Sequence, residues 1–410
     1  TQTISRNAGS MRSTNVYSLH NYNEGGDVSL YTLLEDEDAV KSGELAYKLN
    51  GEKEGVERFY QLIGTDPMPM PIAKEGALVY TRADSYRCDG LPTNITGYAN
   101  TPSETGIPSH DYSAGICSIC GVLEENYITP VDGWYEIGNA AQLMWWARYA
   151  AEVDLSANAR LTADIDMEEY SATYPDRSYP QIGNETTPFY GNFDGQYHTI
   201  SNLEINLPEK RGAGLIGVMN SQPSNGFGGL SAEDARAAEG VFVKNVVLDK
   251  TCSILGQGYT GVVGMSANWP GHITISGVLN MGDATVDGGT NGAGLFGCAM
   301  GSACHMTISN CGFIGNVHVL NDTHTENGLF SGWLGQYAEV TNCFAMGTID
   351  EYPDPARSWA RHPNYNTVVI KNCYALEGSG VTETGYDSNP EDVTFLPAEA
   401  IVSGSLAWKA

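Results

Sequence analysis

Short segments of alternating apolar and polar residues recur along the second half of the chain, and all but one end in asparagine followed by a small or apolar residue. The first full copy lies in residues 189–205, FYGNFDGQYHTISNLEI, where the alternating segment ends at Asn202. The equivalent positions in the later copies are Asn245, Gly277, Asn310, Asn342 and Asn372. Alternation of this kind is typical of strands that bury one face. Six copies predict one β unit that is repeated along the chain.

The spacing of these positions indicates coils that stack on one another. Successive positions are 43, 32, 33, 32 and 30 residues apart, and an insertion at residues 219–240, with a short helix expected at 231–238, accounts for the long first interval. Glycine-rich apolar segments lie between them, at residues 212–217, 261–264, 292–297 and 328–332. Repeats of about 30 residues with several strands and glycine corners predict an all-β fold, a right-handed parallel β-helix (β-solenoid).

Parallel stacking places equivalent residues of successive coils side by side, at about 4.8 Å. We therefore expect Cys311, Cys343 and Cys373 to form a buried column of thiols. The asparagines that precede them should form a ladder of side-chain amides at a bend.

Helical periodicity precedes the repeat. Residues 134–153 predict a helix with Asn139 as its N-cap and Gln142 three residues later. Its apolar face comprises Leu143, Trp146, Ala147 and Ala150. Residues 159–167 then alternate like a strand. We expect the helix to cap the first coil, whose strand edges would otherwise be open.

The two ends of the chain resemble each other. Residues 12–18, RSTNVYS, are similar to 370–375, IKNCYA, and residues 40–48, VKSGELAYK, are similar to 402–409, VSGSLAWK. The offsets predict that the chain covers slightly more than one period of a tandem array, with a period of roughly 360 residues. Chance likeness between two short amphipathic helices is the alternative.

A cysteine and histidine knuckle lies between the N-terminal segments and the repeat. Cys117 and Cys120 stand in CSICG, with Cys88 and His110 upstream. A CxxC turn followed by glycine lets two thiolates reach one ion, and a further Cys and His complete a tetrahedral shell. We expect structural zinc at these four residues, because the segment is poor in core residues and a metal would contribute folding free energy. A Cys117–Cys120 disulfide, free thiols and a redox-active CxxC are the alternatives.

These features divide the chain into five expected parts. They are the end of a preceding body (1–22), a junction helix at 36–49 with a proline-rich extended connector at 59–80 (23–80), the Cys/His knuckle (81–133), the capping helix with the β-helix (134–375) and the start of the next junction (376–410).

Other candidate sites have less support. Asp164 and Asp166 form a single acidic pair, which we assign to turns. The histidines do not recur at one coil position in the sequence, so no column of histidine ligands is expected. Residues 352–365 form an aromatic segment that either stacks on sugar rings or, in the interpretation we favour, covers the last coil.

Charge and composition narrow the function classes. The net charge of the 410-residue chain is −28, which argues against nucleic acid and anionic membrane surfaces as partners. No run of about 18 apolar residues is present, so membrane insertion is not expected. Nine cysteines are too few for a disulfide scaffold of this length.

Four segments, in this order, resemble the GLUG-motif β-helix proteins of gut and other anaerobic bacteria. They are YEIGNAAQL (135–143), LTADID (161–166), GNFDGQYHTI (191–200) and GLFG (294–297). Residues 42–51 and 110–121 are similar to junctions beside such repeats. The sequence departs from the pattern at Phe330-Ser331-Gly332 and at Gly277. The resemblance implies a secreted or cell-surface, adhesin-like protein, and the family has no catalytic residues to carry over.

We therefore expect a non-catalytic structural or adhesive module of a large extracellular tandem-repeat protein. Its expected partners are neighbouring repeats or copies of the chain joined end to end as a filament, and surface glycans. The alternatives are a carbohydrate-active β-helix enzyme and a glycan-binding module without catalysis. An enzyme would need paired carboxylates on one face of the solenoid. The candidates are Asp249, Asp283, Asp287, Asp322 and Glu339, with Lys244 and Lys250 as bases.

Overall fold

The structure is a computed structural model of the chain, and it describes residues 14–19, 31–34, 36–53, 56–226, 229–320, 327–350, 358–361, 367–381 and 393–399. The chain divides into two compact units, Thr1–Glu124 and Glu125–Ala410. Each unit has a hydrophobic core of its own. The finer division into five parts stays a prediction.

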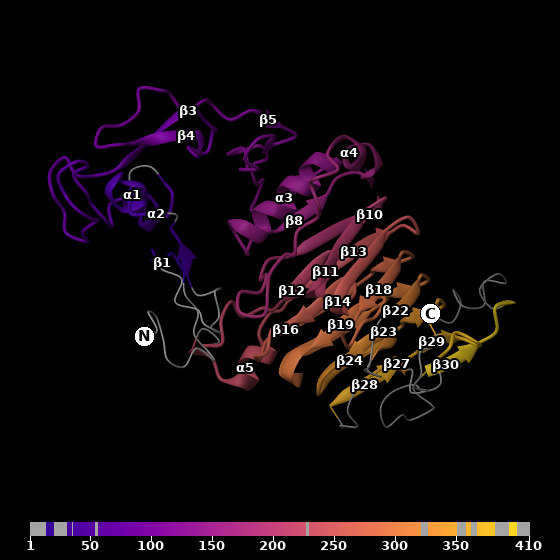
Figure 1. Cartoon of the computed structure of the whole chain (residues 1–410). Coiled ribbons are helices and arrows are strands. Elements are labelled where there is room, and N and C mark those ends of the chain that lie inside the picture. The colour runs from indigo at the N-terminus through magenta and orange to yellow at the C-terminus, as the bar shows by residue number, and fades with distance from the viewer. Residues whose placement is uncertain are drawn as a thin grey trace. The chain divides into compact units, whose positions relative to one another are not determined.

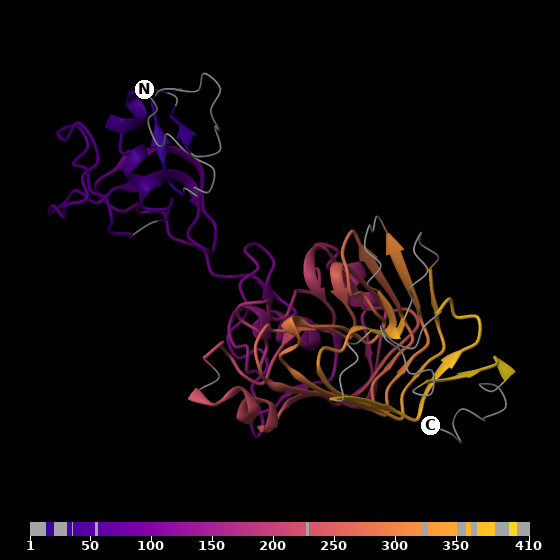
Figure 2. The ribbon, with the colours of Figure 1, turned by 90° about the horizontal axis from the view of Figure 1, so that it is seen from below.

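Parallel strands build the second unit, as the repeat predicted. Its described residues form three sheets of 14, five and five strands, and all of their strand pairs are parallel. Strands of successive coils lie side by side from β10 to β28 (Figure 1), and Figure 2 shows the same coils from below. The sequence thus correctly predicted an all-β fold of the parallel β-helix type.

The bounds of the strands follow the coils. The large sheet contains β7 (Tyr135–Ile137), β8 (Ala159–Leu161), β9 (Ile165–Asp166), β10 (Phe193–Ser201), β13 (Val241–Leu248), β16 (His272–Ser276), β17 (Leu279–Asn280), β20 (His305–Ser309), β21 (Gly312–Phe313), β24 (Tyr337–Thr341), β25 (Phe344–Ala345), β28 (Val368–Lys371), β29 (Cys373–Leu376) and β30 (Val393–Leu396). The second sheet contains β11 (Glu204–Ala213), β14 (Ser253–Thr260), β18 (Asp283–Asp287), β22 (Asn316–Leu320) and β26 (Thr348–Ile349). The third contains β12 (Ile216–Met219), β15 (Val263–Ser266), β19 (Phe296–Ala299), β23 (Gly328–Trp333) and β27 (Ser358–Ala360).

Each coil places its apolar residues above those of the coil before. One column of the large sheet runs through Val243, Ile275, Ile308, Val340 and Ile370. All five side chains are buried. Because alternate residues of a strand point to opposite faces, this register keeps one face of every coil inside.

The repeated asparagines form the corners of the coils. Asn202, Asn245, Asn310, Asn342 and Asn372 all have φ between 54° and 56°. This is the left-handed region, which asparagine tolerates better than most residues and glycine tolerates best. Gly277, the departure from the pattern, has φ 62°. The corner therefore selects the residue type.

The amide ladder and the thiol column are both present. Asn372 Nδ2 donates to Asn342 Oδ1 at 2.8 Å, and Asn342 Nδ2 donates to Asn310 Oδ1 at 3.2 Å. Cys311, Cys343 and Cys373 follow these corners and are fully buried. They belong to the core, as expected.

The glycine-rich segments form the third sheet, where the backbone of one coil approaches the next closely. A Cβ atom on Gly297 would lie 2.2 Å from the Gly264 carbonyl oxygen. In β23 the sequence Phe330-Ser331-Gly332 departs from the GLFG motif and places Ser331 opposite Phe296. Phe330 is buried at the neighbouring position.

Three α-helices accompany the described coils: α3 (Ala140–Glu152), α4 (Glu168–Thr173) and α5 (Ala232–Ala237). The Asn139 side chain accepts from Gln142 N at 3.0 Å, as a predicted N-cap should. The predicted apolar face of α3 is buried, and its Trp146 ring contacts Phe189 and Phe193. Ser231 caps α5, which confirms the helix expected in the insertion. No helix of the described residues is long and apolar enough to cross a membrane.

The first unit is smaller and irregular. It contains β1 (Tyr17–Ser18), β2 (Thr32–Leu33), α1 (Asp38–Lys41), α2 (Glu44–Leu49), β3 (Tyr80–Tyr86), β4 (Pro92–Ala99), β5 (Tyr112–Ser113) and β6 (Ile116–Cys117). The junction helix expected at 36–49 is broken in two at Gly43, which has φ 98°. A Cβ there would lie 2.7 Å from Ile63 Cδ1. The helix breaks so that the chain can pack closely.

Residues 59–80 are not the extended connector that their prolines predicted. Tyr60 and Met70 form an antiparallel bridge, so the segment folds back on itself. Val79 is buried with Ala46 and Tyr47, and Ile63 packs against them. Proline excluded a helix here, but the packing of the apolar residues between the prolines decided the path of the chain.

Candidate metal centre

Two β-hairpins bring the four predicted ligands together. Cys88 lies in the turn that joins β3 to the antiparallel β4. Cys117 ends β6, which pairs with β5, and Cys120 follows in the next turn. His110 stands just before β5. The ligand atoms of all four residues lie within 4.8 Å of one another.

The distances fit a single tetrahedral ion. A Zn–S bond of about 2.3 Å and a Zn–N bond of about 2.0 Å place two sulfurs about 3.8 Å apart and a sulfur and a nitrogen about 3.6 Å apart. Cys88 Sγ and Cys117 Sγ are 3.5 Å apart, and Cys120 Sγ and His110 Nδ1 are 3.4 Å apart. These two pairs would need to separate by only a few tenths of an ångström to bind one ion.

The knuckle turn is fixed by its backbone. Gly121 N donates to the Cys117 carbonyl at 3.0 Å, and Gly121 has φ 75°, which glycine adopts without strain. Cys117 N donates to the Val122 carbonyl at 2.9 Å, which closes the turn from the other side. Both thiols of the CxxC segment are therefore held on one side of the turn.

The thiols differ in acidity. Burial raises the pKa of the Cys88 thiol to about 12, and hydrogen bonds with the Cys120 and Cys117 thiols add to this shift. Burial also opposes ionisation of Cys117, but the backbone N–H groups of Cys120 and Ile119, together with His110, stabilise its thiolate and lower its pKa to about 6. A cation binding here would meet the Cys117 thiolate at neutral pH and would displace the proton of the Cys88 thiol.

No disulfide joins these residues, because all nine cysteines are free thiols. The 3.5 Å between Cys88 Sγ and Cys117 Sγ exceeds a disulfide bond of about 2.05 Å. The described residues contain no other group of three or more Cys, His, Asp and Glu side chains close enough to hold one ion. The geometry supports a metal site and leaves the identity of the metal open.

The acidic pair forms structural hydrogen bonds, within a turn at Asp166 and to a neighbouring strand at Asp164. Asp164 Oδ1 accepts from Thr199 N at 2.9 Å, and Asp166 Oδ1 accepts from Glu168 N at 3.0 Å. With Asp249 they line an open hollow of about 450 Å³.

The other enzyme candidates are dispersed. Lys244 pairs with the buried Asp194 at 3.2 Å. Asp283 lies beside His318. Asp322 lies outside the described residues.

One histidine expectation was wrong. His272 and His305 lie opposite each other in β16 and β20, and their rings stack at 4.8 Å. Their separation of 33 residues equals that of Gly277 and Asn310, so the repeat could have revealed the alignment. His324 lies outside the described residues.

Part of the aromatic segment 352–365 is also described. Trp359 in β27 is fully buried and stacks on Phe330, with ring centroids 4.4 Å apart. Its ring is therefore not available to sugars.

Comparison with known proteins adds little. No protein-family profile matches the chain, and no curated protein matches it. Among solved structures, one described as a putative immunoglobulin A1 protease from Bacteroides ovatus is 17 % identical, covers 67 % of this chain and 87 % of its own, and has a TM-score of 0.39. At this similarity, its name carries no argument about the present chain.

Proposed function

We propose that the chain is a non-catalytic structural or adhesive module of an extracellular tandem-repeat protein, similar to the GLUG-motif β-helix proteins. Its right-handed solenoid serves as a stiff spacer, α3 caps the first coil, and the Cys/His knuckle holds structural zinc in the junction. Neighbouring repeats or copies of the chain are its partners, and surface glycans are a further partner class.

The likeness of two strand pairs carries this proposal. In the last coil, β29 pairs in parallel with β30, and Tyr374 lies opposite Thr394. In the first unit, β1 pairs in parallel with β2, and Tyr17 lies opposite Thr32. The residue pair, the direction and the order along the chain are the same.

The corner before each strand pair agrees as well. Asn15 has φ 54°, the value found at Asn372. Residues 14–19 and 31–34 therefore resemble the end of a solenoid in their local structure. The junction sequence VKSGELAYK follows them in the chain. The similar segment at 402–409 lies outside the described residues.

The strand β29 in the last coil and its likeness β1 in the first unit differ in how deeply they are buried. Cys373 is 1 % exposed because β25 and the rest of the coil lie beside it. Val16, its equivalent, is half-buried. We infer that β1 gains its full core when a preceding coil stacks on it.

A chain of two periods tests the array. This chain is a fusion of two copies of the sequence: residues 1–371 of the first copy are followed directly by residues 15–410 of the second, so that Lys371 precedes Asn15. We expect the amides of the second Val16-Tyr17-Ser18 segment to exchange at least tenfold more slowly than those of the first, because they lie in a continuous sheet. The peptides at the two positions differ in their preceding residues, so mass spectrometry separates them.

The control joins Lys371 to Val16. It deletes the left-handed corner and shifts the strand by one residue, which turns its apolar side chains to the other face. Equal exchange in both two-period chains would contradict the array. A glycan panel with product analysis tests the remaining part of the proposal, since cleavage of any glycan would exclude a non-catalytic module.

A further inference from the structure

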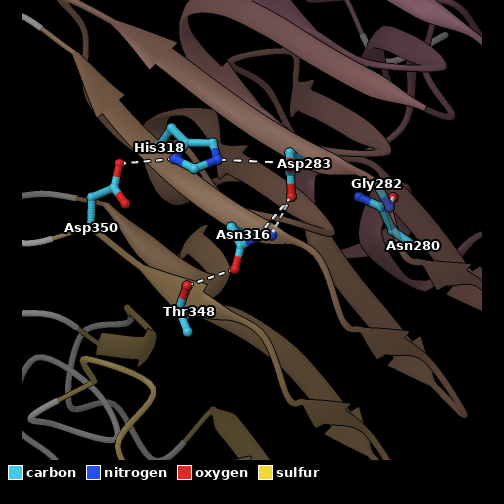
Figure 3. Close-up of polar contacts among 7 residues, drawn as sticks. All are labelled: Asn280, Gly282, Asp283, Asn316, His318, Thr348 and Asp350. Carbon is cyan, nitrogen blue, oxygen red and sulfur yellow. Dashed lines mark hydrogen bonds and ion pairs between the residues drawn. The ribbon is translucent and has the colours of Figure 1, made fainter. Parts of the chain in front are cut away.

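A polar network lies on the second sheet of the solenoid and spans three successive coils. Asp283 comes from β18, Asn316 and His318 from β22, and Thr348 and Asp350 from the end of β26 and the residue after it. Figure 3 shows the His318 ring between the carboxylates of Asp283 and Asp350. The side chains of His318, Asp283 and Asp350 are 37 %, 46 % and 44 % exposed, so solvent reaches all three.

Asp350 fixes the orientation of the His318 ring. His318 Nδ1 and Asp350 Oδ2 are 2.9 Å apart, and Asp350 directly follows Ile349, which lies opposite Val317 in the pairing of β22 and β26. A neutral imidazole that donates Nδ1–H to a carboxylate has its lone pair on Nε2. Histidines that bind metals almost always donate their other ring N–H in this way.

Asn316 fixes Asp283. The backbone N and the side-chain Nδ2 of Asn316 both donate to Asp283 Oδ1, at 2.8 and 3.1 Å. The Thr348 hydroxyl donates to Asn316 Oδ1 at 2.6 Å and so orients its amide. Asp283 Oδ2 is left facing His318 Nε2 at 3.7 Å, which is longer than a hydrogen bond.

We propose that His318 Nε2 and Asp283 Oδ2 bind a divalent transition-metal ion such as Zn²⁺, Ni²⁺ or Cu²⁺. A lone pair on Nε2 and a carboxylate oxygen that face each other repel unless a proton or a metal cation lies between them, and at 3.7 Å a proton on Nε2 makes an ion pair without a hydrogen bond. An ion about 2.1 Å from each atom spans the 3.7 Å gap at an angle of about 124°, which is roughly 15° wider than the tetrahedral angle. Imidazole with carboxylate suits these ions better than Mg²⁺ or Ca²⁺.

The site differs from the knuckle in kind. Two protein ligands leave the other coordination positions to water, so the ion is exchangeable, whereas the four ligands of the knuckle close its shell. The net charge of −28 raises the local concentration of cations near the sheet. The proposal stands independently of the array and of the identity of the metal in the knuckle.

The test is a titration of the full chain with Zn²⁺ and with Co²⁺. We expect one metal ion to bind at the knuckle, where Co²⁺ gives a thiolate-to-cobalt charge-transfer band. A second metal ion should bind with lower affinity and without that band. H318N and D283N should abolish the weaker equivalent and leave the thiolate signal unchanged. D350N should weaken this equivalent 10- to 100-fold, because Asp350 acts on the ion only through the His318 ring.

His198 provides the matched control. Among the described residues, Asp164 is the one carboxylate that pairs with the His198 ring, at 3.2 Å. H198N should leave both equivalents in place. In the unaltered chain, Zn²⁺ should also shift the imidazole NMR signals of His318 more than those of His198. A single equivalent in the unaltered chain, or a second equivalent that survives H318N, would overturn the proposal.

Discussion

The knuckle and the solenoid use cysteine in opposite ways. In the solenoid, burial is the main cause that raises the pKa of Cys343, and its neighbours in the column are the thiols Cys311 and Cys373. In the knuckle, backbone N–H groups and His110 outweigh burial and lower the pKa of Cys117. The first arrangement makes a small apolar side chain, and the second makes a ligand. The neighbours of a cysteine, and not its burial alone, decide which it becomes.

The two regions also differ in what stabilises them. Every coil of the solenoid buries apolar residues and bonds its backbone to the next coil. Residues 110–124 of the knuckle consist of two-residue strands and turns, with Cys117 and Ile116 among their few buried side chains. A short segment of this kind would rely on the proposed zinc ion, because a structural zinc site contributes about 10–16 kcal/mol of apparent binding free energy.

Removing the ion should have the largest effect, and it should be confined to the knuckle. C117S is expected to lose the metal and the hydrogen-exchange protection of residues 110–124, while the thermal unfolding of the solenoid is unchanged. Metal analysis measures the loss of the ion, and hydrogen exchange measures the loss of protection. C343A is the matched control: it should keep the metal and destabilise the solenoid by about 1 kcal/mol or more. Metal retained in C117S would show that the four ligands do not act together.

Truncating Trp359 should weaken the solenoid and spare the knuckle. Its ring is fully buried against Phe330, and its Nε1 donates to the Tyr374 carbonyl at 3.1 Å. We expect W359A to cost about 3–5 kcal/mol in urea unfolding. W333A, at a half-buried position, should cost less. An unchanged stability of W359A with lost glycan binding would restore the sugar-stacking interpretation of this segment.

The asparagine corners separate backbone strain from side-chain bonding. N342A should cost about 1–2 kcal/mol, because alanine at φ 55° is strained and the amide ladder is interrupted. N342G removes the ladder but relieves the strain, so it should cost clearly less. Chemical unfolding of the two variants gives the free-energy cost of the lost ladder, from N342G, and the additional cost of backbone strain, from N342A. Equal losses would mean that the ladder, not the corner, selects asparagine.

Acid should produce the smallest effect, at the turns beside the first coil. Hydrogen bonds from Asn202 and Glu168 lower the pKa of Asp166 below its ordinary value of 3.8. The unfolded chain therefore binds this proton more readily, so the stabilisation is complete well above pH 3.8 and is lost as the pH falls through the lower native pKa. Urea midpoints between pH 6 and 3 should fall less for D166N than for the unaltered chain. D176N, at an exposed position, serves as the control.

The sequence by itself determined the features that repeat or that are local. The period, the parallel strands, the asparagine corners, the cap at Asn139 and the helix after Ser231 follow from alternation, spacing and local hydrogen bonding. The four knuckle ligands were also predicted, since CxxC before glycine specifies a turn that presents two thiols. In a parallel stack, residues that are one period apart in the sequence lie side by side in adjacent coils. The columns of cysteine and asparagine were therefore predictable.

The tertiary structure decided what depends on irregular packing or on orientation. The close approach of Ile63 breaks the junction helix at Gly43, and the apolar residues between the prolines fold 59–80 into the first unit. Trp359 became a core residue because β27 pairs with β23. Asp283, His318 and Asp350 come from three coils, and their meeting required both the register and the outward face of each strand. A single sequence gives the spacing of such residues, but only the folded coils give the direction of their side chains.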